Sequence, residues 1–166
     1  MNEKLKPINT SIYEFPDLIK DGYVYVDKTD LVYKLVNSGK AYFFARPRRF
    51  GKSLLVSTLD AYFSGQKELF SGLAIEKLEQ DWGKYPVIRI DFSGDNYEFE
   101  ENLSSKFNII LKNLENKYGS NKTDNLSFAC RLEQVIISAY EQTGKRVVVL
   151  VDESDKPILD ALYQPH

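Results

Sequence analysis

Cysteine and histidine are nearly absent from this chain of 166 residues, which has only Cys130 and the last residue, His166. A single cysteine excludes an intrachain disulfide and a multi-cysteine zinc site, and a terminal histidine leaves no basis for histidine-based catalysis. The N-terminus has no apolar run typical of a signal peptide, and no segment approaches the roughly 20 apolar residues of a membrane span. We therefore expect a cytoplasmic protein without membrane contact.

A strong excess of one charge is also lacking. The sequence has 22 Lys and Arg residues against 24 Asp and Glu residues, a net charge of −2. This balance removes the strongest argument for extensive nucleic-acid binding, although a local basic cluster leaves that partner open. The hydrophobic share of 43% is typical of a globular protein. The length predicts a single domain over residues 1–166.

Strand-like and helix-like segments alternate along the chain. Strands are expected at 23–26, 41–45, 87–92 and 147–151, and helices from Thr29 or Asp30 to Gly39, at 54–62, at 99–118 and from 128 to Gly144. The runs 41–45 and 147–151 are apolar throughout, as in strands that are buried on both faces. This order predicts an α/β fold with a mainly parallel sheet, right-handed crossovers and helices on both faces, which makes three αβα layers.

The segment Arg46-Pro47-Arg48-Arg49-Phe50-Gly51-Lys52-Ser53 follows the expected strand 41–45 and opens a helix. Gly51-Lys52-Ser53 matches the second half of a phosphate-binding loop, in which lysine reaches the β- and γ-phosphates and the serine hydroxyl can ligate Mg²⁺. The full pattern requires a glycine at position 46, where this sequence has arginine. An ordinary helix start therefore stays open as the alternative.

An acidic pair, Asp152-Glu153, directly follows the expected strand 147–151. In phosphate-loop ATPases, an aspartate at this place holds the metal and the next glutamate polarises the attacking water. Acidic residues also cap helices after parallel strands, but both motifs in this order on strand ends favour the nucleotide site.

Five segments together resemble the bacterial AAA-ATPase-like family: Tyr25–Thr29, Arg46–Leu54, Leu69–Leu73, Tyr85–Ile88 and Val151–Ile158. The family typically lacks the first loop glycine, which accounts for Arg46. Ser154 departs from the resemblance, because an aromatic residue is expected there. The resemblance implies a P-loop nucleoside-triphosphatase fold, often followed by a PD-(D/E)XK nuclease-like domain.

The resemblance also implies residue roles. Nucleotide binding falls to Arg46, Pro47, Arg48, Arg49, Phe50, Gly51, Lys52, Ser53 and Leu54. Ser53 and Asp152 would hold Mg²⁺, and Glu153 matches the catalytic glutamate. ATP and Mg²⁺ are therefore the expected ligands, with GTP as an open alternative. The segment Tyr25–Thr29 resembles a box that packs near adenine, and a turn capped by Asp27 or Thr29 is the alternative.

Two strands that commonly follow the acidic pair in such ATPases have no counterpart here. We therefore expect the N-terminal part of a longer protein, with weak or absent hydrolysis and the ability to form a homo-oligomer. The expected strands 41–45 and 147–151 would pair directly, or a segment of another copy or of rearranged chain would lie between them. A non-catalytic nucleotide- or anion-binding interaction module is the competing function. The arginines could contact phosphates, pair with acidic groups or stay solvated.

Overall fold

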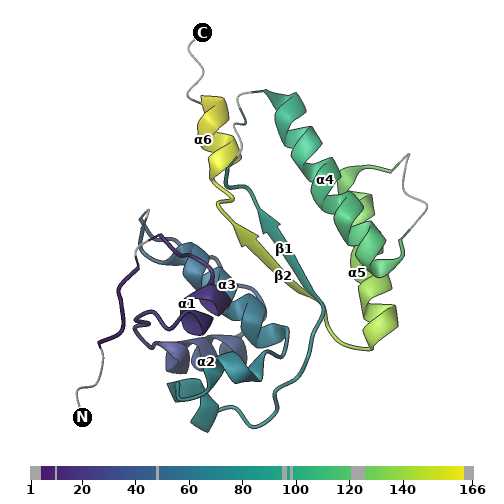
Figure 1. Cartoon of the computed structure of the whole chain (residues 1–166). Helices are drawn as coiled ribbons and strands as arrows, with labels where there is room; N and C mark the ends of the chain where they lie inside the picture. The colour runs from purple at the N-terminus through teal and green to yellow at the C-terminus, as the bar shows by residue number, and fades with distance from the viewer. Residues whose placement is uncertain are drawn as a thin grey trace. The chain divides into compact units, whose positions relative to one another are not determined.

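The computed structural model describes residues 5–9, 11–47, 49–94, 97, 99–120 and 126–162. Figure 1 shows the order of the elements along the chain. They are α1 (Phe15–Lys20), α2 (Thr29–Ser38), α3 (Lys52–Phe63), the 3₁₀ turns η1 (Lys67–Phe70) and η2 (Ala74–Lys77), β1 (Val87–Asp91), α4 (Glu100–Tyr118), α5 (Phe128–Thr143), β2 (Val148–Asp152) and α6 (Lys156–Leu162).

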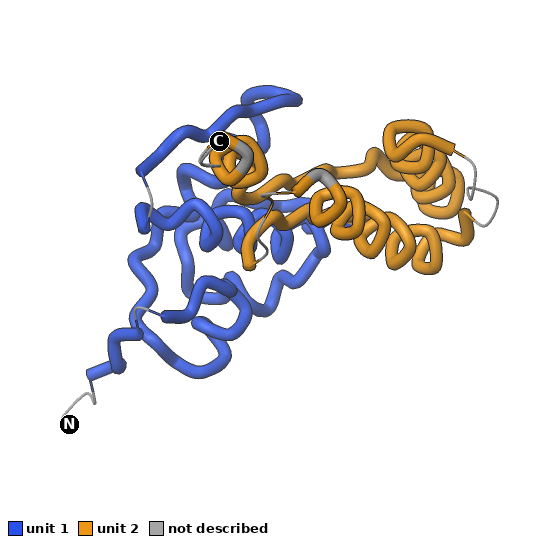
Figure 2. The backbone as a smooth tube through the Cα atoms, turned by 90° about the horizontal axis from the view of Figure 1, so that it is seen from above, with its two compact units in different colours: residues 1–84 blue, residues 85–166 orange. Residues whose placement is uncertain are grey.

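The chain divides into two compact units, residues 1–84 and 85–166, which Figure 2 colours separately. Each unit has its own hydrophobic cluster of buried side chains. The expectation that residues 1–166 form the N-terminal part of one nucleotide-binding domain stays a prediction.

The unit of residues 1–84 is helical in its described part. Its cluster joins α1, α2, α3 and the two 3₁₀ turns through Phe15, Val32, Ala61, Phe70 and Ile75. Phe15 and Phe70 are fully buried, with ring centroids 4.9 Å apart. Large aromatic side chains supply much of the buried apolar area in such a small unit.

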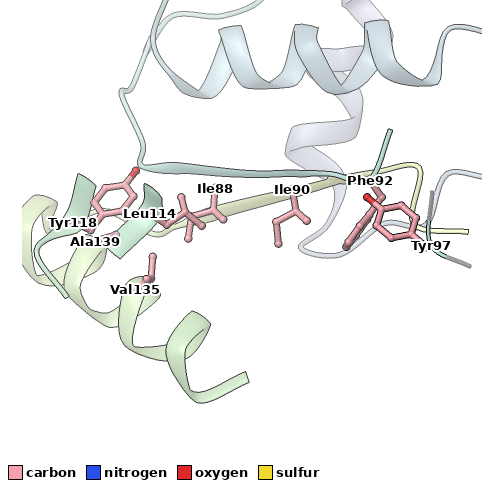
Figure 3. Packing of buried hydrophobic residues seen from close by; sticks show 8 residues of the cluster. All are labelled: Ile88, Ile90, Phe92, Tyr97, Leu114, Tyr118, Val135 and Ala139. Atoms are coloured by element: carbon pink, nitrogen blue, oxygen red, sulfur yellow. The ribbon is translucent and has the colours of Figure 1, made fainter. Parts of the chain in front are cut away.

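The unit of residues 85–166 contains a two-stranded parallel sheet. Val87 pairs with Val148 at one end of the ladder and Asp91 with Asp152 at the other. The helices α4 and α5 form the connection between the two strands and pack against one face of β1 (Figure 1). Figure 3 shows Ile88 and Ile90 pointing into the cluster that contains Leu114 of α4 and Val135 of α5.

The ends of α4 and α5 have clear local causes. Gly119 and Gly144 follow the two helices with positive φ values of 67° and 62°, a conformation that glycine adopts without steric cost. Ser127 caps the start of α5, because its side chain accepts a hydrogen bond from the Cys130 N–H. The sequence predictions for these two helices are confirmed, with small shifts of the boundaries.

Two predicted strands are wrong. Residues 23–26 and 41–45 form no strand in the structure, and Tyr42, Phe43 and Phe44 are exposed. A strand needs hydrogen bonds to a neighbouring strand, and in the described part of the chain only β1 and β2 pair. The expected pairing of 41–45 with the strand at 147–151 would join the two units and stays a prediction.

Other boundaries also differ from the predictions. The last strand is Val148–Asp152. Val149 and Val151 pair in register with Ile88 and Ile90 but lie outside the hydrophobic cluster of this unit and stay exposed by 42% and 46%. The helix α2 begins at Thr29 but is preceded by Lys28 at the N-cap, so neither Thr29 nor Asp30 caps it. The short helix α1, with Pro16 in its first turn, was not predicted. The α/β class with parallel strands is confirmed, and the three-layer P-loop arrangement stays a prediction.

Candidate functional site

The predicted phosphate-binding loop leads directly into α3. Gly51 stands at the N-cap of this helix with a φ of 76°, and Lys52 and Ser53 are its first two residues. Arg49 also has a positive φ, 64°, which is unusual for a residue with a side chain. Arg46, Pro47, Arg49, Phe50 and Gly51 are exposed. Arg48, which is also predicted to bind nucleotide, lies outside the described residues.

Lys52 lies across its own loop. Its ammonium group donates a hydrogen bond to the backbone carbonyl of Arg46, with an N···O distance of 3.1 Å. The guanidinium group of Arg46 lies over the ring of Phe44, 5.5 Å from its centroid. The loop is therefore closed by the side chain of its own lysine, and a positive charge stays close to the loop backbone.

The start of α3 provides donors for an anion. Its first intrahelical hydrogen bond runs from the Leu55 N–H to the Gly51 carbonyl, at 2.9 Å. The N–H groups of Lys52, Ser53 and Leu54 precede that bond, and helix geometry gives them no intrahelical acceptor. These groups and the helix dipole favour a negatively charged ligand. The side chains of Lys52 and Ser53 are half-buried.

The acidic pair stands at the end of β2, in the unit of residues 85–166. Asp152 is buried, with 4% of its surface exposed, and its Oδ1 atom accepts a hydrogen bond from the Glu153 N–H at 3.0 Å. Glu153 has a φ of 52°, in the left-handed region. A residue with a side chain is strained there, and such strain is concentrated at functional sites. Ser154, where the resemblance expected an aromatic residue, is exposed.

Asp91 is a candidate that the sequence analysis missed. It ends β1 and pairs in register with Asp152, so two aspartates end neighbouring strands at the same edge of the sheet. The Asp91 carboxylate accepts hydrogen bonds from the Ser93 N–H and hydroxyl, at 2.8 and 3.0 Å. Both strands end on an aspartate in the sequence, and this shared feature could have identified Asp91.

The segment Tyr25–Thr29 makes tertiary contacts through its polar side chains. Asp27 Oδ1 accepts hydrogen bonds from the N–H and the hydroxyl of Thr29, and Asp27 Oδ2 accepts one from the Ala74 N–H of η2. The fully buried hydroxyl of Thr29 accepts a hydrogen bond from the Ile75 N–H at 3.0 Å. Asp27 thus holds the turn before α2, although it does not occupy the N-cap position.

The comparisons with known proteins identify the class to which these features belong. Residues 9–166 match the family described as "Predicted AAA-ATPase". The chain belongs to this AAA-ATPase-like family, as the resemblance of its motifs indicated.

A curated protein of Azotobacter chroococcum mcd 1 is 43% identical over 146 residues, and it is described as "Uncharacterized protein in vnfD 5'region". The aligned part covers 87% of this chain but only 28% of that relative. No solved structure matches the chain significantly. Among the described helices, none combines the length and the apolar character that crossing a membrane requires.

Proposed function

We propose that this chain is the nucleotide-binding part of a Mg²⁺-dependent P-loop ATPase with a three-layer αβα fold. One observation carries the proposal: Gly51, in a left-handed conformation, turns the chain into α3, and Lys52 at the helix start reaches back over the loop. Membership of the AAA-ATPase-like family supports the same function. An ordinary helix start would not require a lysine bonded to the loop backbone.

On this proposal, the Lys52 ammonium group exchanges the Arg46 carbonyl for phosphate oxygens and neutralises their charge. The N–H groups of residues 52–54 donate hydrogen bonds to the same anion. Arg46, Arg49 and the neighbouring loop residues surround the phosphates or the base.

The donor set of the proposed metal site fits Mg²⁺. The Ser53 hydroxyl and the Asp152 carboxylate are hard oxygen ligands, and Mg²⁺ in such sites needs only one or two protein ligands beside phosphate oxygens and water. The bound ion would neutralise charge on the phosphates. Glu153 would accept the proton of the attacking water. The proposal requires Ser53 and Asp152 to serve the same ion.

The whole protein is a separate part of the proposal. The chain spans 28% of the length of the curated relative, so a longer protein with further domains is expected. A C-terminal nuclease-like domain, a homo-oligomer and a cytoplasmic location belong to the proposal, as does weak or absent hydrolysis by these 166 residues alone.

Titration of the chain with a fluorescent ATP analogue, with and without Mg²⁺, tests the proposal. The parent should bind, and Lys52→Ala should lose binding without unfolding, because an exposed or half-exposed lysine contributes little to stability. Lys67→Ala, which removes an exposed lysine of η1, is the matched control and should bind like the parent. Equal affinity of the Lys52→Ala variant and the parent would refute the assignment.

Two further variants separate the ATPase from the non-catalytic module. Asp152→Ala should weaken binding in the presence of Mg²⁺ more than in its absence. Glu153→Gln should keep binding and abolish phosphate release. Binding by the parent without any phosphate release would favour the interaction module. Salt-sensitive binding of DNA that Arg48→Ala abolishes would instead favour a nucleic-acid partner.

A further inference from the structure

Glu153 has a backbone conformation that its surroundings must hold in place. Its φ of 52° lies in the left-handed region, which costs energy for any residue with a side chain. Such strain persists only where the surrounding structure determines the conformation more strongly than the residue itself does. Glu153 belongs to the connection between β2 and α6, so the two ends of this connection decide its conformation.

The end of β2 is fixed on one side of Glu153. Asp152 pairs in register with Asp91 of β1, and its carbonyl accepts a hydrogen bond from the Phe92 N–H at 3.3 Å. Phe92 is itself buried in the hydrophobic cluster of this unit. The residue before Glu153 therefore cannot move without breaking the end of the ladder.

The helix α6 begins three residues after Glu153 and needs an anchor. The Lys156 N–H donates a hydrogen bond to the Glu153 carbonyl at 3.0 Å, which closes the turn into the helix. However, α6 is only seven residues long. Isolated helices of fewer than about 12 residues are barely stable in water, so tertiary contacts must hold α6 in place.

Asp160 of α6 provides this anchor. Its Oδ2 atom accepts hydrogen bonds from the Lys156 ammonium group at 2.6 Å and from the Tyr97 N–H at 3.1 Å. The Lys156 ammonium group also lies over the Tyr97 ring, 5.4 Å from its centroid. Tyr97 is 3% exposed and packs edge-on against Phe92, and Figure 3 shows the two rings together. Two contacting aromatic residues thus hold the two ends: Phe92 bonds to Asp152, and Tyr97 bonds to Asp160.

We propose that Asp160 is a positioning residue for Glu153. This inference rests on the proposed function, in which Glu153 is the base. Only residues 153–155 connect Asp152 to α6, and with both ends fixed this short connection turns with Glu153 in the left-handed conformation. Without the Asp160 carboxylate, α6 can shift and Glu153 can relax to a negative φ. That change redirects the proposed base relative to Asp152.

Phosphate release by variants of Asp160 tests the proposal. Asp160→Ala should slow it about tenfold or more, a part of the factor of about 100–10,000 that a well-placed base contributes. The affinity for Mg-ATP should not change, because the base acts on the attacking water. Asp160→Asn keeps an oxygen that can accept the Tyr97 N–H, so it should retain most of the parent rate.

Asp30→Ala is the matched control. It removes another Lys–Asp pair four residues apart on a helix, the pair of Asp30 with Lys34 on α2, at 3.5 Å. Such pairs contribute little by themselves, so phosphate release should stay at the parent rate. An equal loss in Asp30→Ala, or an equal loss of affinity in Asp160→Ala, would show a general loss of structure and would overturn the positioning role.

Unfolding in urea gives a measurement that does not depend on nucleotide. Glycine adopts a positive φ without the steric cost that alanine has, so Glu153→Gly should be more stable than Glu153→Ala in the parent chain. In the Asp160→Ala background the backbone can relax, and this difference in stability should fall to less than half. In the Asp30→Ala background the difference should keep its full size.

The two measurements separate the inference from the proposed function. If the parent releases phosphate and Asp160→Ala releases it equally fast, the inference is wrong. If the parent binds no Mg-ATP, the proposed function fails, and binding without phosphate release favours the non-catalytic module. In either of these cases the urea comparison decides the inference alone: a smaller difference in the Asp160→Ala background supports it, and an unchanged difference overturns it.

Discussion

The left-handed conformation of Glu153 predicts that a glycine at this position gives a more stable protein than an alanine, the reverse of the order found inside helices. With a φ of 52°, this residue is in a region that costs an L-residue about 1–2 kcal/mol. Glycine avoids that cost but loses about 0.5–1 kcal/mol more conformational entropy on folding than alanine does. The steric cost of alanine is the larger of the two, so glycine is the more stable residue at this position. We therefore expect Glu153→Gly to have a free energy of unfolding about 0.5–1 kcal/mol higher than that of Glu153→Ala.

Both substitutions remove the whole carboxylate side chain, so their comparison isolates the backbone. Glu133 provides a control, because it is exposed within α5. At that helical position alanine should be more stable than glycine by about 1 kcal/mol. The glycine variant should therefore have the higher free energy of unfolding at position 153, and the alanine variant should have it at position 133.

Urea unfolding followed by far-ultraviolet circular dichroism is the suitable assay. The single tryptophan, Trp82, packs against Tyr62 and Phe70 in the unit of residues 1–84, so its fluorescence reports on the other unit. Phosphate release should be absent from both variants at position 153, since neither has a carboxylate there. If Glu153→Ala is as stable as Glu153→Gly or more stable, the backbone at this position is not strained and the reasoning is refuted.

Three further predictions concern stability. Arg131 binds Glu115 in a nearly buried, bidentate ion pair between α5 and α4. Arg131→Met should lower the free energy of unfolding, measured by chemical denaturation, by about 3 kcal/mol, because it leaves the Glu115 charge buried without this partner. The double variant Arg131→Met/Glu115→Leu should recover most of this loss. Ile88 is fully buried in β1, so Ile88→Ala should lower the free energy of unfolding by about 2–5 kcal/mol and Ile88→Val by far less. Equal losses of stability in the two variants would contradict the close packing of this side chain. Burial alone would raise the pKa of Asp27, but hydrogen bonds from Thr29 and Ala74 outweigh it and lower the pKa. The stability that Asp27 provides is thus complete above its ordinary pKa and is lost as the pH falls through the lowered value. Acid titration followed by Trp82 fluorescence should show this contribution in the parent and not in Asp27→Asn.

The long amphipathic helices were predictable because their periodicity is local. Apolar residues recur every three or four positions along α4 and α5, and Gly119 and Gly144 end them. The strands β1 and β2 were also predicted, with boundaries that differ by one residue, because a β-branched run favours a strand whichever neighbour it pairs with. By contrast, residues 41–45 have strand composition but form no strand, because composition does not supply a hydrogen-bonding neighbour.

The candidate site shows the same division. The order Gly51-Lys52-Ser53 before a helix and Asp152-Glu153 after a strand follows from the sequence, as does membership of the AAA-ATPase-like family. The register that brings Asp91 opposite Asp152 does not, because pairing between strands depends on contacts across 61 positions. Figure 1 shows the two strands side by side, with all of α4 and α5 between them in the sequence.

The sequence by itself determined the types of the main helices, the two paired strands and the identity of the loop and acidic residues, because each depends on neighbours within a few positions. Only the tertiary structure decided which polar groups are buried together. Ser57 is an unremarkable helix residue in the sequence, but folding places its hydroxyl between the Phe15 N–H and the Glu14 carboxylate. Likewise, Glu153 acquires its left-handed backbone where β2 turns toward α6. The burial of these polar groups and the strain at Glu153 depend on contacts between residues distant in sequence, which a local pattern does not specify.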